Sequence, residues 1–386
     1  MNLRLFFPVL LSFSLCYSDV AQAQPMLSYT DPQGNLYVSD SGRLVHLDHM
    51  RIRSVQYAAN SMAYINNNGE LFYYADHTQQ NLEINNPTFY QNTDYYLYYG
   101  TGGSFSLYDG KERKYLGFIQ NHPFCFGDSL AAMHDYSGYF YVYEQGQFIE
   151  LEQNPVLRAA AGDNTLAYIN HLGQFRVYYH GEQMDVDSYA PISFQAGANT
   201  VAYIDNFQYL KVLWQGEIAE LTHYTTINCL STTVNSEPEL ELYCNGPVVV
   251  DVQSELPVFK TGDDVVAFID DEGDFSVYSK GIIVKLEDQL PQQYTITDNL
   301  LWYIDANGFL KAFLDGELHM VETYMPATIR ADKDVLAYTD LDNRLKAFYK
   351  GKKIQVSENI IQSFELNNTM VMYSDMPNKY KFFILK

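Results

Sequence analysis

The chain has 386 residues and a formal net charge of −23 at pH 7, with 47 acidic side chains against 24 basic ones. This balance excludes the basic stripe that nucleic-acid binding requires, so we expect no nucleic-acid partner. The length fits two or three ordinary domains or one large repeat domain. Tyrosine is unusually common, with 34 copies against 2 tryptophans, which is typical of half-buried strands that keep the hydroxyl at an edge.

Residues 1–23 have the features of a secretory signal peptide. A positive residue precedes an apolar run over residues 5–15, and Ala21 and Ala23 form a small-x-small cleavage site. We expect a bacterial protein that begins at Gln24 after cleavage and is exported to the periplasm or cell surface, or secreted. No later stretch approaches the roughly 18 apolar residues of a membrane helix. We therefore predict no transmembrane segment, and peripheral association with the outer membrane is the alternative to a free protein.

One segment of the sequence is repeated along the chain. Residues 199–221, NTVAYIDNFQYLKVLWQGEIAEL, have counterparts that begin at Asn164, Asp264, Asn299 and Asp334. One position in the first strand of each repeat serves as a marker, and successive markers mostly lie 34 or 35 residues apart. Self-similarity at such a period is typical of solenoids and propellers. The marker residues are Tyr29, Tyr64, Tyr98, Met133, Tyr168, Tyr203, Phe268, Tyr303, Tyr338 and Tyr373.

Each repeat predicts four short strands. The segment TVAYID has apolar side chains at both odd and even positions, so this strand should be buried on both faces. A turn such as Asp305 to Gly308 follows and leads into a partner strand that ends in a second Gly. A third strand, a variable connection and a fourth strand complete the unit. A small residue recurs in the fourth strand, which indicates that these strands converge on an axis. It is Ala161, Ala196, Thr261 or Ala331.

Antiparallel strands that are apolar on both faces need a neighbouring sheet on each side, as in the blades of a β-propeller. We predict an all-β protein in which residues 24–386 form one large β-propeller of about 10 to 11 short four-stranded blades. Two smaller propellers and a β-solenoid are the alternatives. The strand order resembles that of WD-type propeller repeats, although their Gly-His and Trp-Asp signatures are missing and the unit is shorter. This resemblance implies an architecture and no particular activity.

Two departures from the repeat bear on how the ring is built. The first unit, from Gln24, lacks an inner strand, and the last unit, up to Lys386, lacks a third strand. These ends are complementary, so we expect the ring to close by shared strands. An irregular repeat near residues 227–252 is shortened, since Gly216 and Gly246 lie 30 positions apart. Interpreted as a trimmed hairpin, it brings the total to eleven hairpins.

The irregular repeat contains two of the cysteines, Cys229 and Cys244. In an oxidising compartment, their place within one repeat predicts a disulfide between them. Cys125 is then left unpaired. Aromatic residues flank it on both sides, which favours a buried thiol over a reactive nucleophile.

The sequence lacks the motifs of common enzyme and cofactor sites, including H-E-x-x-H, C-x-x-C, the P-loop and G-x-S-x-G. The acidic segment from Asp270 to Asp274 does not have the register of a calcium loop, and we interpret it as a hairpin turn. We therefore assign no catalytic, cofactor-binding or metal-binding residue and expect no cofactor.

These observations favour a non-catalytic binding or scaffold protein of the bacterial envelope, which recognises an envelope protein or a glycan with the rim or a face of the propeller. The alternative is a carbohydrate-active envelope hydrolase or lyase with a site in the central funnel. The two differ in where the repeats should depart from each other. An enzyme needs nonrepeating polar or ionisable residues that converge at one end of the axis, whereas a scaffold can spread its differences over the rim.

Overall fold

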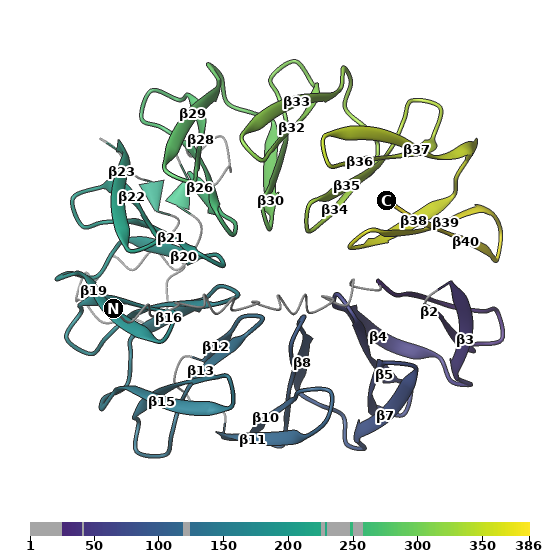
Figure 1. The fold of residues 1–386 in the computed structure, drawn as a ribbon, viewed down its shortest axis with the longest axis horizontal. Coiled ribbons are helices and arrows are strands. Elements are labelled where there is room, and N and C mark those ends of the chain that lie inside the picture. The colour runs from purple at the N-terminus through teal and green to yellow at the C-terminus, as the bar shows by residue number, and fades with distance from the viewer. Residues whose placement is uncertain (1–24, 41, 119–123, 225–227, 230–247, 250–257) are drawn as a thin grey trace, which may run out of the picture.

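The computed structural model describes residues 25–40, 42–118, 124–224, 228–229, 248–249 and 258–386. In these ranges the chain forms a ring of ten small antiparallel sheets, or blades (Figure 1). Eight blades have four strands and two have three. The prediction of a large all-β propeller is confirmed. Numbered in chain order, the blades span residues 27–48, 52–83, 89–118, 125–152, 158–187, 193–223, 259–287, 293–322, 329–360 and 363–384.

Blade 8 shows how one repeat folds. From the ring axis outward, its strands are β30 (Gln293–Thr297), β31 (Leu300–Ile304), β32 (Leu310–Leu314) and β33 (Glu317–Glu322). We call these strand positions a, b, c and d. On strand b, Leu301 and Tyr303 pack against blade 7. Leu300 and Ile304 point the other way and pack against blade 9. Strand b is therefore buried on both faces because each face meets a neighbouring blade.

The two faces of the ring carry different turns. Successive strands run in opposite directions, so the a–b and c–d turns lie on one face and the b–c turns on the other. We call them the a–b face and the b–c face. In blade 8, Oδ1 of Asp305 accepts hydrogen bonds of 2.9 Å from the backbone N of Asn307 and of Phe309. Gly308 has a φ of 82°, which glycine adopts without steric penalty, so the predicted b–c turn is confirmed.

The two ends of the chain form separate three-stranded blades. Blade 1 consists of β1 (Leu27–Thr30), β2 (Leu36–Asp40) and β3 (Arg43–Asp48), without a strand a. Blade 10 consists of β38 (Ser363–Asn367), β39 (Met370–Met376) and β40 (Lys379–Ile384), without a strand d.

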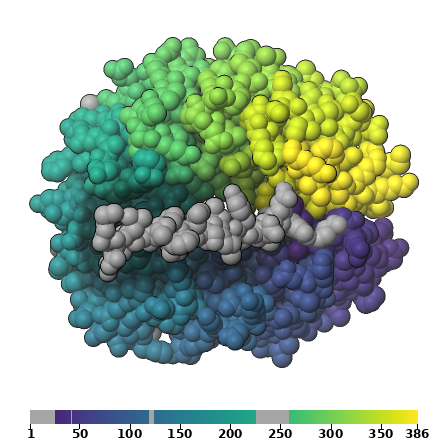
Figure 2. Space-filling model, viewed as in Figure 1, coloured from purple at the N-terminus to yellow at the C-terminus, as the bar shows by residue number. Residues whose placement is uncertain are grey.

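From the sequence we expected the ring to close by shared strands. In the described residues it does not, because blades 1 and 10 are separate sheets. Blade 10 keeps its own inner strand, so its sheet meets blade 1 face to face. Leu27 packs against Met370 and Met372, and Nδ2 of Asn367 donates to the carbonyl oxygen of Met26 at 2.8 Å. Packing therefore closes the ring where the purple and yellow ends of the chain meet in Figure 2.

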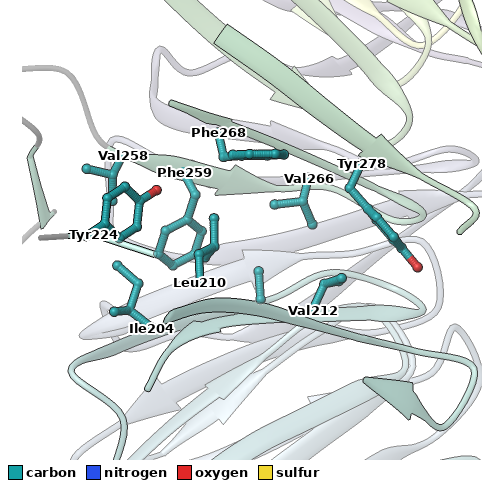
Figure 3. Packing of buried hydrophobic residues seen from close by; sticks show 10 residues of the cluster. Ile204, Leu210, Val212, Tyr224, Val258, Phe259, Val266, Phe268 and Tyr278 are labelled. Carbon is teal, nitrogen blue, oxygen red and sulfur yellow. The ribbon is translucent and has the colours of Figure 1, made fainter. Parts of the chain in front are cut away.

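The irregular repeat is not an eleventh blade. Its described part is a pair of two-residue strands, β24 (Asn228–Cys229) and β25 (Val248–Val249), outside the ten blades. Blades 6 and 7, which precede and follow it, pack directly on each other, with Leu210 against Val266 and Phe268 (Figure 3). Tyr224 and Val258 flank the irregular repeat and join the same cluster. The described part of the irregular repeat adds no blade, so the described residues form ten blades.

A carboxylate on the b–c face joins neighbouring blades. The marker Tyr303 donates its hydroxyl to Oε1 of Glu287, the last residue of blade 7, at 2.7 Å. Lys311 bonds the same oxygen at 2.5 Å. The sequence predicts a tyrosine with its hydroxyl at a strand edge but not this partner, which lies 16 residues earlier in the chain. Equivalent contacts pair Tyr168 with Glu152 and Tyr338 with Glu322.

Candidate functional site

The a–b turns of neighbouring blades are hydrogen-bonded to each other near the ring axis. The backbone N of Ser129 in blade 4 donates to O of Asp163 in blade 5 at 2.9 Å. In the same way, the backbone N of Asn199 donates to O of Asp263 at 3.0 Å, and that of Asp263 to O of Asp298 at 2.9 Å. The next blade thus satisfies backbone groups that would otherwise lack partners. These bonds fix where the side chains of the turns lie.

Four of these turns contain a glycine that leaves no room for a larger residue. A Cβ on Gly162 would lie 1.8 Å from O of Gly197, and a Cβ on Gly197 would lie 1.7 Å from O of Gly262. Gly127 is as crowded, at 1.7 Å from O of Gly162. The sequence indicates crowding at Ala161 and its equivalents. The closest approach between blades is instead at the glycine that follows.

In six of the nine a–b turns that the structure describes, the next position holds an aspartate or a lysine; the other three have Ala59, Ala198 and Asn368. We call these six residues the acidic ring: Asp94, Asp128, Asp163, Asp263, Asp298 and Lys333. Lys333, in blade 9, binds Oδ2 of Asp94, in blade 3, although the two residues are 239 positions apart. Its Nζ also lies 4.0 Å from Oδ2 of Asp298. The ammonium group of Lys333 is thus shared by carboxylates from two other blades, blade 3 and blade 8.

Four carboxyls of the acidic ring bind protons more readily than ordinary aspartates. Burial raises the pKa of Asp128, Asp163, Asp263 and Asp298 to about 6, and neighbouring carboxylates add to the shift. Burial lowers the pKa of Lys333, but its hydrogen bond to Asp94 and the surrounding carboxylates outweigh this effect and raise that pKa above its ordinary value. The acidic ring therefore changes its charge near pH 6.

A cavity of about 490 Å³ lies on the same face, beside the acidic ring. It extends over blades 1 to 3, from Asn60 and Asp94 at the inner turns to Asp76 and Asp109 at the c–d turns. Tyr95 in its wall is 66% exposed. A volume of this size suits a small ligand or one part of a larger one. Further lining residues are Asp40, Tyr73, His77, Gln80, Tyr108 and Lys111.

The structure describes the side chain of one of the three cysteines that follow residue 23, Cys125. The side chain of Cys229 and all of Cys244 lie outside the described residues, so the disulfide between them stays a prediction. Cys125 is a free thiol on strand a of blade 4. Burial raises the pKa of this thiol to about 12, which makes it a poor nucleophile at neutral pH, as the sequence predicts.

The acidic segment of blade 7 forms the expected turn. Oδ1 of Asp270 accepts hydrogen bonds from the backbone N of Glu272 and of Asp274, at 3.0 and 2.9 Å. In the part of the chain that the structure describes, no group of three or more His, Cys, Asp or Glu side chains is placed to hold a metal ion. The same part contains no helix that is long and apolar enough to cross a membrane.

The sequence alone assigned no site role to any residue of the acidic ring or the cavity. For the acidic ring a signal exists, because three of the four Gly-Asp pairs, at 127–128, 162–163 and 262–263, follow strand a. The cavity has no such signal. No other described c–d turn has a histidine at the position of His77, and Lys111 belongs to a c–d turn that is longer than the others the structure describes. Only the fold therefore shows that the two side chains line the same cavity.

Comparison with known proteins identifies the architecture. A model of the 10-bladed β-propeller domain matches residues 20–130, 118–235 and 231–385. No curated protein matches the chain.

Several solved structures are similar over most of the chain. The computationally designed Ika8 protein has 14% identity over 84% of this chain and 99% of its own, with a TM-score of 0.37. BamB from Moraxella catarrhalis has 12% identity over 77% and 94%, with a TM-score of 0.33. PorZ, a surface component of the type-IX secretion system of Porphyromonas gingivalis, has 10% identity over 92% and 56%, with a TM-score of 0.27. Similarities at this level carry no functional conclusion.

Proposed function

The chain belongs to the 10-bladed β-propeller domain family, and we propose that it is an exported, non-catalytic binding or scaffold protein of the bacterial envelope. It recognises an envelope protein or a glycan with the a–b face of the ring. The observation that carries this proposal is the cavity over blades 1 to 3, which combines tyrosines with acidic, basic and amide side chains. The signal-like residues 1–23 support export.

The position of the cavity supports recognition by a face of the ring. Its polar residues come from the inner turns and the c–d turns of three neighbouring blades, so they lie to one side of the axis. At these turns His77 takes the place of a glycine, and Asp109 and Lys111 belong to a c–d turn that is longer than the others the structure describes. A funnel enzyme would instead require nonrepeating groups that converge on the axis. The cavity therefore favours a binding protein over the alternative.

One observation favours the alternative, a carbohydrate-active hydrolase or lyase. The raised carboxyl pKa values of the acidic ring, about 6 at Asp163 and Asp263, lie in the range that suits a general acid. However, these carboxyls occupy the same turn position in blades 4, 5, 7 and 8. They are a product of the repeat and not a set of residues specific to one reaction, so we place this function second.

The proposed function predicts that the mature protein retains an envelope component. We would pass envelope extract over immobilised protein and probe a glycan array in parallel. Replacing Lys111 by alanine should reduce the retained component severalfold, because this exposed side chain lines the cavity. Lys352→Ala is the matched control. That exposed lysine lies next to a c–d turn on the same face, but in blade 9, far from the cavity.

The possible outcomes separate the two functions. Retention by the native protein and by the Lys352 variant, with loss in the Lys111 variant, supports recognition at the cavity. Turnover of any arrayed glycan would overturn the non-catalytic proposal in favour of the hydrolase or lyase. Retention of nothing from either source would contradict both.

A further inference from the structure

One c–d turn differs from all the other two-residue c–d turns that the structure describes. Both residues of this tight turn have positive φ, a geometry in which glycine is strongly preferred at the second place. In blade 2 that place is taken by His77, with a φ of 60°, after Asp76 with a φ of 48°. A side chain in this conformation is strained, and such strain is most often found at functional sites. The other two-residue turns that the structure describes in full have Gly146, Gly181, Gly216, Gly281, Gly316 and Gly351 at this place.

A buried carboxylate orients the His77 ring. Nδ1 of His77 lies 2.6 Å from Oδ2 of Asp40, whose side chain is 2% exposed. The hydroxyl of Tyr74 donates to the same oxygen at 2.7 Å. A carboxylate can only accept, so Nδ1 carries the proton, and this fixes the tautomer of the neutral ring. Nε2 is then the nitrogen that a ligand can reach, since the side chain is 68% exposed and lines the cavity.

The other groups around the cavity suit a polyhydroxylated ligand. Asp76 and Asp109 are carboxylates that accept from hydroxyl groups, and Lys111 is a donor. Gln80 is held in place because Tyr108 donates to its Oε1 at 2.6 Å. The exposed ring of Tyr95 offers an apolar surface to a sugar face. A basic peptide would also match the carboxylates, but the ammonium group of Lys111 would repel its cationic side chains.

We infer that the cavity binds a saccharide and that Nε2 of His77 accepts a hydrogen bond from one of its hydroxyl groups, with Asp40 as the residue that positions the imidazole. This inference rests on the proposed binding function and names its ligand. It explains why blade 2 keeps a histidine at a place where glycine would avoid strain.

The test compares glycan binding by variants of the full mature protein. Replacing His77 by glycine restores the residue of the other two-residue turns and leaves Tyr74 as a donor to Asp40, so the ring should still fold. Affinity for the strongest oligosaccharide of a glycan array, measured by calorimetric titration, should fall about tenfold, the order of magnitude expected when one hydrogen bond to a ligand is lost. His180→Gly is the matched control. His180 lies in the c–d turn of blade 5 with a φ of 51°, and its ring lies against Tyr179.

A second variant tests the role of Asp40 as a positioning residue. Asp40→Asn should weaken binding of the same oligosaccharide, and nitrogen NMR of the His77 imidazole should report a mixture of tautomers in place of a single Nδ1–H form. If Asp40 were only structural, its replacement would lower the thermal midpoint and leave the His77 imidazole in a single tautomer.

Each outcome decides between the claims. Glycan binding that survives His77→Gly would overturn the inference while leaving the binding function intact. If no arrayed glycan binds but a protein is retained from envelope extract, the saccharide assignment is wrong and the binding function again stands. If neither binds, both fail together.

Discussion

Replacing Gly162 by alanine is expected to destabilise the protein by about 3 kcal/mol or more. The new Cβ would lie 1.8 Å from the carbonyl oxygen of Gly197, which is a backbone atom and cannot rotate away. The a–b turns of blades 5 and 6 would have to move apart. Because neighbouring a–b turns are hydrogen-bonded to each other, the displacement would spread along the ring. The midpoint of thermal unfolding, followed by circular dichroism, measures the loss.

Gly216→Ala is the control for this substitution. A Cβ on Gly216 meets nothing within 4 Å, but the residue has a φ of 82°. Its replacement should cost only the strain of a left-handed residue, roughly 1 to 2 kcal/mol. An equal loss in the two variants would show that contact between turns at the axis does not limit the fold.

Replacing Lys333 by methionine should destabilise the protein by about 2 kcal/mol at pH 7.5. Methionine keeps the apolar stem but removes the ammonium group that binds Asp94 and lies 4.0 Å from Asp298. Lys285→Met is the control, because that lysine pairs with Asp274 and Asp288 from a half-exposed position on a single blade. An exposed pair is worth less than about 1 kcal/mol, so this variant should lose little.

The destabilisation caused by Lys333→Met should become smaller as the pH falls. The pKa of four ring carboxyls is about 6 in the folded protein, above the ordinary value of 3.8. The folded state therefore binds more protons than the unfolded state around pH 5, and these groups stabilise the fold as the pH falls through 6. Carboxyls whose pKa is lowered in the folded protein, such as Asp305, stabilise the fold at neutral pH and stop doing so only at more acidic pH.

Thermal midpoints at pH 7.5 and 5.5 test this sign. The native protein should unfold at a higher temperature at pH 5.5, and the Lys333 variant should gain more than the native protein does. A native protein that is less stable at pH 5.5 would contradict the placement of these carboxyls in a crowded, partly buried ring.

Local pattern was enough to predict most of the fold. Apolar residues at both odd and even positions predicted strand b, and the spacing of Asp and Gly predicted the b–c turn. Both patterns depend only on residues that are neighbours in sequence. The blade count was less certain, since the hairpin pattern near residues 227–252 does not reveal that Leu210 and Phe268 pack directly across it. Closure by packing at Leu27 was also hidden, because strand complementarity is compatible with either form of closure.

The candidate site could not be predicted in the same way. The contact between Lys333 and Asp94 joins residues that are far apart in the chain and depends on the size of the ring. The pair of His77 and Asp40 joins two blades, and neither residue belongs to a recognised motif. The glycines of the a–b turns were visible in the sequence, but their role follows only from the approach of the next blade.

The most direct test of the binding site is hydrogen–deuterium exchange with and without the captured envelope component. We predict slower exchange in peptides that cover residues 75–78, 94–95 and 108–111, which line the cavity on the a–b face. Protection confined to b–c turns such as residues 305–309, or to the outer strands of the blades, would contradict this account.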